Sequence, residues 1–126
     1  CRDFDVESGL ALNSESELKL ENGFAAFTKD FFDNGAYVIE NNQTHEVSLR
    51  DPEGKNYLNV YFPEAPLFGL WSAEKKNAPY AAIEPWFGRC DKEDFNGSLE
   101  EREWGHALAQ GACFQAAYTI EIAGED

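Results

Sequence analysis

Short segments that alternate apolar with polar residues recur along this chain, and turn-forming residues separate them. His45 to Arg50 alternates in this way, and Asn56 to Phe62 does so after the turn sequence Asp51-Pro52-Glu53-Gly54. Proline and glycine stand there at positions that tight turns favour. Because successive side chains of a strand point to opposite faces, the pattern predicts two antiparallel strands, each with an apolar side and a polar side.

The two sides of these strands have different compositions. Val47 and Leu49 are expected to point inward from the first strand. The second strand shows the same period of two, which separates an apolar set from a polar and aromatic set. The latter is either exposed to solvent or forms the floor of a cleft. The apolar set is Leu58, Val60 and Phe62, and the other set is Tyr57, Asn59 and Tyr61.

Further strands are expected on both sides of this pair. Arg2 to Val6 predicts a short strand, whereas the polar stretch Glu7 to Glu17 predicts a loop. Ala36 to Glu40 is expected to form a hairpin with His45 to Arg50. Phe114 to Ile122 alternates most clearly of all, so its apolar residues are expected to complete one core with the other strands. Asn22 and Gly23 predict a small turn between Leu18 and Phe24.

Composition agrees with a β-rich globular protein. The chain has 126 residues, which is enough for one domain with a buried core, and we expect a single domain over residues 1–126. Hydrophobic residues make up 43% and aromatic residues 14%, which argues against disorder. Short alternating strands joined by turns predict an all-β protein, most simply an antiparallel β-sandwich.

Charge and motif content exclude several classes of function. The formal net charge of -14 would repel phosphate backbones, so no nucleic acid partner is expected. No apolar run approaches the length of a membrane span and no secretory signal is present, which indicates a soluble, cytoplasmic protein. No acidic series has the spacing of a calcium loop, so no metal is expected. Cys1, Cys90 and Cys113 form no CxxC pair and are expected to be free buried thiols.

The stretch from Leu67 to Asp91 combines many aromatic residues with one carboxylate, Glu84, that has no evident partner. Pro85 disfavours a helix at the residue before it, which places Glu84 at the end of a strand. Counting by two along that strand puts Tyr80 and Ala82 on the same face as Glu84. The small alanine leaves space above the sheet beside the acid.

Aromatic side chains are expected to surround this space, and they suggest what it holds. Trp71, Trp86 and Phe87 could form its walls, and indole rings stack on the C–H face of a sugar. A carboxylate among indoles loses hydration, which favours a role in proton transfer near neutral pH. The alternative, which spacing alone favours, is that Glu84 is a structural acid bonded to nearby backbone N–H groups.

The amino-acid sequence of this stretch resembles that of a known family. Phe68 to Ser72, followed after a polar loop by Ala78 to Asp91, is similar to the C-terminal signature of the aldose 1-epimerase (galactose mutarotase) family, in its LacX-like branch. Phe27 to Val38 resembles an upstream segment of the same branch, and Glu103 to Ile122 resembles its closing segment. The resemblance implies a galactose mutarotase-like β-sandwich, an aldohexose as substrate, isomerase activity and no cofactor.

The resemblance covers only the C-terminal half of the family's fold. In the family the other half carries the histidines that protonate the ring oxygen, and neither His45 nor His106 lies in a matching motif. The resemblance therefore implies that Glu84 is the general base, while the acid comes from a missing or separate N-terminal half. On this interpretation the edge of Arg2 to Val6 pairs with another polypeptide, either a complementary N-terminal chain or a second copy.

The resemblance also implies residues that bind the sugar. Trp71, Tyr80 and Trp86 would stack on it. Family members have an acidic residue where this chain has Gly35, and Asp33, two residues earlier, could point to the same face of an extended segment. Two functions stay open: a mutarotase that interconverts the anomers of an aldohexose, and a non-catalytic carbohydrate-binding protein.

Overall fold

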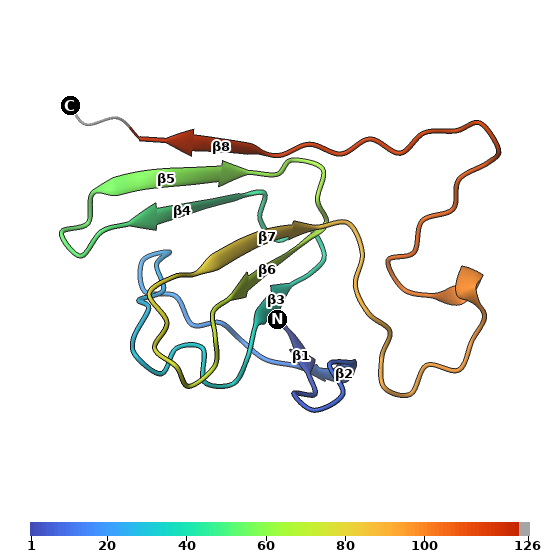
Figure 1. Ribbon diagram of the computed structural model, residues 1–126, viewed down its shortest axis with the longest axis horizontal. Coiled ribbons are helices and arrows are strands. Elements are labelled where there is room, and N and C mark those ends of the chain that lie inside the picture. Colours follow the sequence, from blue (N-terminus) through green and yellow to red (C-terminus); the bar gives the residue numbers. More distant parts are fainter. Residues whose placement is uncertain (124–126) are drawn as a thin grey trace.

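A computed structural model describes residues 1–123 of the chain, which fold into two antiparallel sheets (Figure 1). The predicted all-β, antiparallel sandwich is therefore confirmed. The five-stranded sheet has the order β2-β1-β3-β6-β7 and contains β1 (Arg2–Phe4), β2 (Ala11–Glu15), β3 (Tyr37–Ile39), β6 (Leu67–Trp71) and β7 (Ala82–Trp86). The three-stranded sheet has the order β4-β5-β8 and contains β4 (Glu46–Arg50), β5 (Asn56–Tyr61) and β8 (Thr119–Ile122), and a short 3-10 helix, η1, spans Leu99–Glu101.

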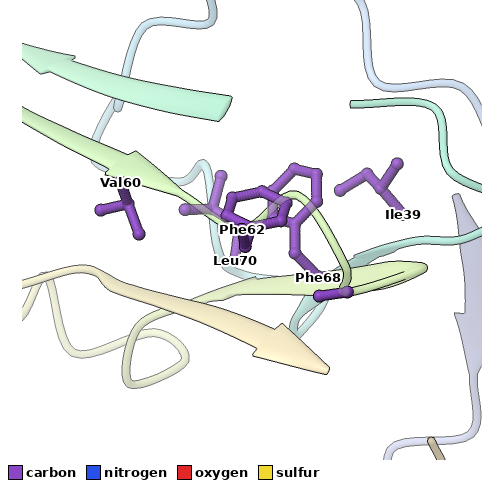
Figure 2. Packing of buried hydrophobic residues seen from close by; sticks show 6 residues of the cluster. Ile39, Val60, Phe62, Phe68 and Leu70 are labelled. Carbon is purple, nitrogen blue, oxygen red and sulfur yellow. The ribbon is translucent and has the colours of Figure 1, made fainter. Parts of the chain in front are cut away.

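The hydrophobic core lies between the two sheets. Phe62, directly after β5, is fully buried, and its ring centroid lies 5.4 Å from that of Phe68 in β6. Figure 2 shows the core side chains gathered between strands of both sheets. Burial of large apolar side chains is the main favourable term in folding, so this cluster holds the sheets together. Its buried members are Ile39, Val60, Phe62, Ala65, Phe68 and Leu70.

The hairpin of β4 and β5 confirms the strongest local prediction. Val47 pairs with Val60 and Leu49 with Leu58, so the apolar residues share one face. The turn closes as the sequence indicates, because the Asp51 N–H donates to the Lys55 carbonyl at 3.0 Å. Gly54 has φ of +84°, a left-handed conformation that glycine adopts without steric cost.

The predicted hairpin between Ala36–Glu40 and His45–Arg50 is wrong. β3 instead lies inside the five-stranded sheet, between β1 and β6, and pairs with β6 through Val38–Gly69 and Ile39–Phe68. The reason is burial, since Val38 is 1% exposed and Ile39 is 9% exposed although they point to opposite faces. A position inside the sheet, with a strand on each side, suits such a segment better than an edge of the two-stranded hairpin would.

The N-terminal segment differs from prediction in two ways. β1 forms as expected, but it lies between β2 and β3 and is not a free edge that awaits another chain. β2 occupies part of the predicted loop Glu7–Glu17. Its residues after Leu12 are exposed and polar, so period-two hydrophobicity could not reveal it; the Arg2 guanidinium stabilises it by donating to the backbone carbonyls of Leu12, Asn13 and Ser14 at 3.2 to 3.3 Å.

The predicted strand Phe114–Ile122 is shorter than expected and does not complete the core. Only Thr119–Ile122 forms a strand, and Figure 1 shows the segment between η1 and β8 on an extended path away from both sheets. Ile120 and Ile122 pair with Val60 and Leu58, so they have the predicted parity. They are nevertheless 54% and 71% exposed, because none of the described residues covers the face of β8. Phe114 and Tyr118 are also exposed.

The turn at Asn22-Gly23 is confirmed. Both residues have positive φ, at 52° and 85°, and Glu21 and Phe24 bond reciprocally through their backbones at 2.9 and 3.0 Å. Two consecutive left-handed residues are the signature of a tight β-hairpin turn. Arg50 lies over the Phe24 ring at 4.2 Å, which joins this turn to the end of β4.

The three cysteines are free thiols, but they are not all buried as predicted. Cys113 is exposed, and Cys1 and Cys90 are partly buried. No helix within residues 1–123 has the length and apolar character that a membrane-spanning helix requires.

Candidate functional site

The candidate acid Glu84 lies on the face of the five-stranded sheet that points away from the core. The strand register places Arg2 beside Val38, Val38 beside Gly69, and Gly69 beside Glu84. Directly paired residues of antiparallel strands share a face, so these four form one row across β1, β3, β6 and β7. The core residues Phe68 and Leu70 point the other way. Glu84 therefore stands at the edge of this row, and its direct neighbour, Gly69, has no side chain.

Glu84 lies in the middle of β7 and not at a strand end, as the proline had suggested. Pro85 is itself part of β7 and pairs with Phe68. Proline lacks the N–H of a sheet ladder, so it is tolerated in a strand that has a neighbour on one side only. β7 is such an edge strand, next to β6 alone. Ala82 shares the face of Glu84, as predicted, and Tyr80 precedes the strand.

Trp86 contacts both Glu84 and the backbone of β6. Its indole N–H donates to Glu84 Oε2 at 3.2 Å. Its six-membered ring lies over Gly69, where an added Cβ would stand 2.9 Å from Trp86 Cζ2. Trp86 and Glu84 are two residues apart on one face of β7, so the indole reaches sideways across β6 instead of standing upright. The sequence predicted an aromatic wall here but not this hydrogen bond.

No ion pair neutralises Glu84 among the described residues, although basic groups lie on the same face. Arg2 and Arg89 both bind Glu40 instead, with the longer contact, from Arg2 Nε to Glu40 Oε2, at 3.4 Å. Glu84 Oε1 accepts no hydrogen bond from another described residue. One oxygen of the carboxylate is therefore held and the other is free to accept a proton.

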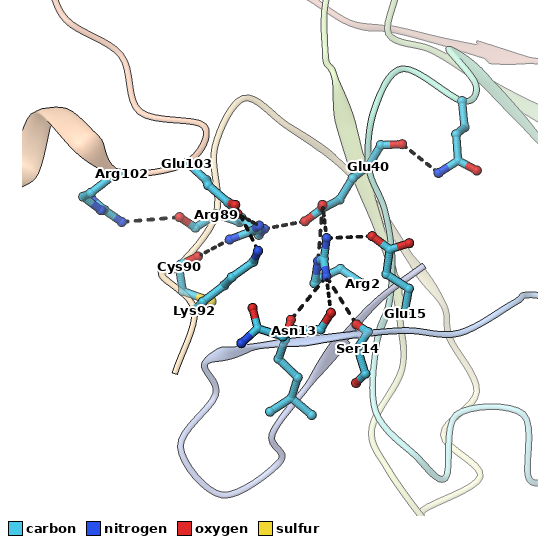
Figure 3. Close-up of polar contacts among 12 residues, drawn as sticks. Arg2, Asn13, Ser14, Glu15, Glu40, Arg89, Cys90, Lys92, Arg102 and Glu103 are labelled. Carbon is cyan, nitrogen blue, oxygen red and sulfur yellow. Dashed lines mark hydrogen bonds and ion pairs between the residues drawn. The ribbon is translucent and has the colours of Figure 1, made fainter. Parts of the chain in front are cut away.

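Arg89 anchors the segment that follows β7 to the sheet (Figure 3). Its side chain is 1% exposed and donates to Glu40 and Glu103 on either side, and to the Cys90 carbonyl at 2.9 Å. Burial alone works against the charge of Arg89, but the bonds to the two glutamates outweigh it and raise the pKa of the guanidinium. The guanidinium is thus a permanent cation between two acids.

Further ion pairs extend this anchor along the same segment. Lys92 Nζ lies 3.0 Å from Glu103 Oε1, and Arg102 Nε lies 2.6 Å from Asp91 Oδ1. The hydrogen bond from Lys92, followed by that from Arg89, lowers the pKa of Glu103 although partial burial opposes the shift. Sequence analysis missed this network because its members are far apart in the chain and no local motif joins them.

Trp71 and Tyr80 form a second aromatic group, separate from Trp86. Their ring centroids lie 6.0 Å apart with planes tilted by 54°, and Tyr80 is 50% exposed. Trp71 pairs with Ala82 across β6 and β7, so it shares the face of Gly69 and Glu84. The half-exposed Tyr80 ring offers a face on which the C–H face of a sugar can stack, with Trp71 beside it.

Asp33 lines a cleft of about 470 Å³ together with Tyr80. A cleft of this size is large enough for a small molecule. Its lining also includes the aromatic side chains of Phe32 and Tyr57 and the cationic side chain of Lys75. Glu84, Trp86 and Trp71 do not line it. The five predicted residues therefore form two groups: Glu84 with Trp86, and Asp33 with Tyr80 and the Trp71 ring that packs near Tyr80.

Neither histidine is hydrogen-bonded to Glu84. His45 Nδ1 lies 3.1 Å from the Phe62 carbonyl on the core side, and His106 Nε2 bonds the Phe87 carbonyl. A second cleft of about 360 Å³ lies beside Arg89 and is lined largely by acidic and polar residues. Residues 1–123 contain no cluster of three or more side chains suited to hold a metal ion.

Comparisons with known proteins identify relatives of this chain. No model of a known protein family matches it. It is 27% identical over 88 residues to the chromosomal and the plasmid protein LacX of Lactococcus lactis subsp. lactis, a match that covers 70% of this chain. A galactose mutarotase related enzyme from Lactobacillus acidophilus is 33% identical over 79% of the chain, with a TM-score of 0.69. The chain is a relative of the aldose 1-epimerases, in the LacX-like branch.

A second solved structure shows the same fold for nearly the whole mutarotase-like chain. A galactose mutarotase-like protein from Lactobacillus casei ATCC 334 superposes on 97% of it with a TM-score of 0.82, at 23% sequence identity. The chain spans 27% of the length of the two LacX proteins, and 34% and 42% of the two solved proteins. The matched part of each relative is thus less than half of that protein.

Proposed function

We propose that this mutarotase-like chain contributes the general base and part of the sugar surface to an aldose 1-epimerase, with an aldohexose as substrate. Glu84 takes the proton of the anomeric hydroxyl. An acid protonates the ring oxygen, the bond from C1 to that oxygen breaks, and an open-chain aldehyde forms. Rotation about C1–C2 and the reverse steps then close the ring as the other anomer. Both proton transfers reverse on closure, so no cofactor is consumed.

The orientation of Glu84 and its lack of a cationic partner among the described residues carry this proposal. The side chain points away from the core and has one oxygen on the indole N–H of Trp86. None of the described lysines or arginines forms an ion pair with it. A structural acid in this part of the molecule behaves differently, as Glu40 does by binding two arginines. The second oxygen of Glu84 has no partner among the described residues, so it can accept a hydrogen bond from a substrate hydroxyl.

The acid of the reaction is proposed to come from outside residues 1–123. His45 and His106 bond backbone carbonyls and not Glu84. Relatives extend well beyond the part that this chain matches. A residue from such a further part, on the same polypeptide or on another, would protonate the ring oxygen while Glu84 removes the hydroxyl proton.

Polarimetry on freshly dissolved α-glucose and α-galactose tests the proposal. The chain is assayed alone and mixed with the part of the Lactobacillus casei protein that it does not match. We expect acceleration in the mixture, and Glu84→Gln should reduce it by roughly a hundredfold to ten-thousandfold because the base is lost. Glu64→Gln, at an exposed acid outside the site, is the matched control. An equal rate for Glu84→Gln and the parent would overturn the assignment.

Non-catalytic carbohydrate binding is the second candidate function, and the Trp71–Tyr80 pair favours it. These rings are partly exposed beside the cleft that Asp33 lines. In that case sugars would bind without acceleration of mutarotation in any mixture. Titration of sugars against tryptophan fluorescence measures this binding, which Tyr80→Ala should weaken. Binding without any acceleration of mutarotation in the mixture distinguishes this second function from the first.

A further inference from the structure

We propose that Gly69 and Trp86 are positioning residues for Glu84. Because glycine has no side chain, the Trp86 indole can pack directly on the backbone at Gly69, and we call this position its seat. In the seat, the indole directs its N–H to one oxygen of the Glu84 carboxylate. The free oxygen is thereby turned toward the substrate. This inference rests on the proposed role of Glu84 as general base, and it assigns Trp86 a purpose other than stacking on sugar.

The contact between Gly69 and Trp86 leaves no room for a side chain. A Cβ at residue 69 would lie 2.9 Å from Trp86 Cζ2 and 3.2 Å from Cε2, closer than carbon atoms approach without a clash. The backbone does not require glycine here, because Gly69 is an ordinary residue of β6 and is not among the glycines with positive φ. The three described atoms nearest to such a Cβ all belong to the Trp86 indole, so the position of this ring depends on glycine at residue 69.

The seat also determines where the indole N–H points. Trp86 and Glu84 project from the same face of β7, and the indole bends over β6 to reach Gly69. In this orientation Nε1 lies 3.2 Å from Glu84 Oε2. If the ring were pushed off Gly69, Nε1 would move with it, since ring and N–H are one rigid group. Displacement of the ring thus breaks the hydrogen bond.

No other described group can take over this orientation. The nearby cations Arg2 and Arg89 are both paired with Glu40. Trp86 supplies the one hydrogen bond to the Glu84 side chain from residues 1–123. A base whose carboxylate is held in one rotamer is better placed for proton transfer than one that rotates freely.

Nuclear magnetic resonance of the indole N–H groups tests the hydrogen bond without any need for catalysis. The chain has three tryptophans, so three indole signals are expected, and Trp→Phe variants assign them. Between about pH 3 and pH 7, where carboxyl groups ordinarily titrate, the Trp86 signal should shift with Glu84. Glu84→Gln should abolish that shift. A Trp86 signal that does not move, or that moves equally in Glu84→Gln, would overturn the inference.

Gly69→Ala tests the seat. This variant should lose the pH-dependent shift of the Trp86 signal, whereas Gly105→Ala should keep it, because a Cβ at Gly105 meets its nearest atom at 3.4 Å and has ordinary space. Retention of the shift in Gly69→Ala would show that the indole does not depend on glycine. Loss of the folded spectrum would show that Gly69 serves the sheet itself, and this outcome also overturns its role as a positioning residue.

The catalytic assay separates failure of this inference from failure of the proposed function. In the reconstituted mixture Gly69→Ala and Trp86→Phe should lower kcat by about tenfold to a hundredfold with little change in KM, as expected for a base out of position. If Glu84→Gln is inactive while both variants keep full kcat, only the positioning role is wrong. If Glu84→Gln is fully active, the proposed function is wrong, and the resonance experiment still decides whether the hydrogen bond exists.

Discussion

Arg89 donates its Nε–H to Glu40, a residue 49 positions earlier in the chain, and both side chains are almost entirely removed from solvent. The contact ties the segment after β7 to the end of β3, on the same face of the sheet as Glu84. A buried pair of this kind is costly to break, because the remaining partner is left as an uncompensated charge. The network therefore has consequences for stability that can be measured.

Glu40→Ala should strongly destabilise the protein. Loss of Glu40 leaves Arg89 buried without its main acid and Arg2 without one of its two acids, at a cost of about 3–5 kcal/mol. Urea unfolding followed by circular dichroism measures the change. Glu15→Ala removes the other acid that pairs with Arg2. The Glu15 side chain is 63% exposed, so this substitution should cost only about 0–1 kcal/mol. Equal effects of the two variants would contradict this account of the network.

Acid should weaken the anchor through Glu103. The pKa of this carboxyl is lowered from its ordinary value of 4.5 by Lys92 and Arg89, against partial burial. A carboxyl group whose pKa is lower in the folded than in the unfolded protein contributes its full stabilisation above the unfolded pKa. This contribution to the free energy of unfolding disappears as the pH falls through the folded-state pKa. As the pH is lowered below about 4.5, the stability of Glu103→Gln should therefore fall less than the stability of the parent protein. Thermal unfolding across that interval is the measurement, and parallel curves would contradict the prediction.

Phe62→Ala should be among the most destabilising substitutions in the chain. Phe62 is fully buried and packs on Phe68 in the core between the sheets. Truncation of a buried phenylalanine typically costs about 3–5 kcal/mol, since apolar contacts are lost and a cavity remains. Chemical denaturation provides the value, and a loss below about 1 kcal/mol, which is usual for surface substitutions, would contradict the central place of Phe62 in the core.

Ile122→Ala should have little effect, although Ile122 has the same parity as the core residues of β5. It pairs with Leu58 but is 71% exposed. Exposed substitutions usually change stability by less than about 0.5 kcal/mol. The same denaturation assay applies to the chain by itself. A loss as large as that of Phe62→Ala would mean that β8 is covered in solution by protein that residues 1–123 do not provide.

Gly54→Ala should destabilise the β4–β5 hairpin through the backbone alone. Gly54 has φ of +84° and a Cβ there would meet no atom within 4 Å, so the substitution causes strain without a clash. A left-handed conformation costs an L-residue about 1–2 kcal/mol. Glu53→Ala, at the exposed neighbouring position, is the control. Equilibrium unfolding of both variants checks the difference.

Local features of the fold could be predicted from the sequence, whereas long-range pairings could not. The β4–β5 hairpin follows from alternation and from Asp51-Pro52-Glu53-Gly54, which act within a few residues. The partner of β3 is β6, which follows only after the intervening β4–β5 hairpin, and no local pattern in either strand encodes that pairing. β2 shows hardly any alternation of apolar and polar residues. Hydrogen bonds from Arg2 to its backbone carbonyls stabilise it instead, and such long-range bonds leave no local pattern in the sequence.

The candidate site was predictable in its residue types and not in its geometry. The aromatic segment and the resemblance indicated Glu84, and the strand parity of Ala82 and Glu84 was right. The contact of Trp86 with Gly69 depends on the register between β6 and β7, which no single segment encodes. Parity also placed Ile120 and Ile122 correctly, but burial requires an opposing surface, and a period of two contains no information about that surface.

The strand order has a consequence for how the molecule unfolds. β4 and β5 of the three-stranded sheet lie in sequence between β3 and β6, which are hydrogen-bonded neighbours in the five-stranded sheet. A cut in the chain anywhere between β3 and β6 separates two adjacent strands, so neither sheet exists as a contiguous segment that proteolysis could release intact. The two sheets share one core and one interleaved path, and they should lose their structure together in a single cooperative transition.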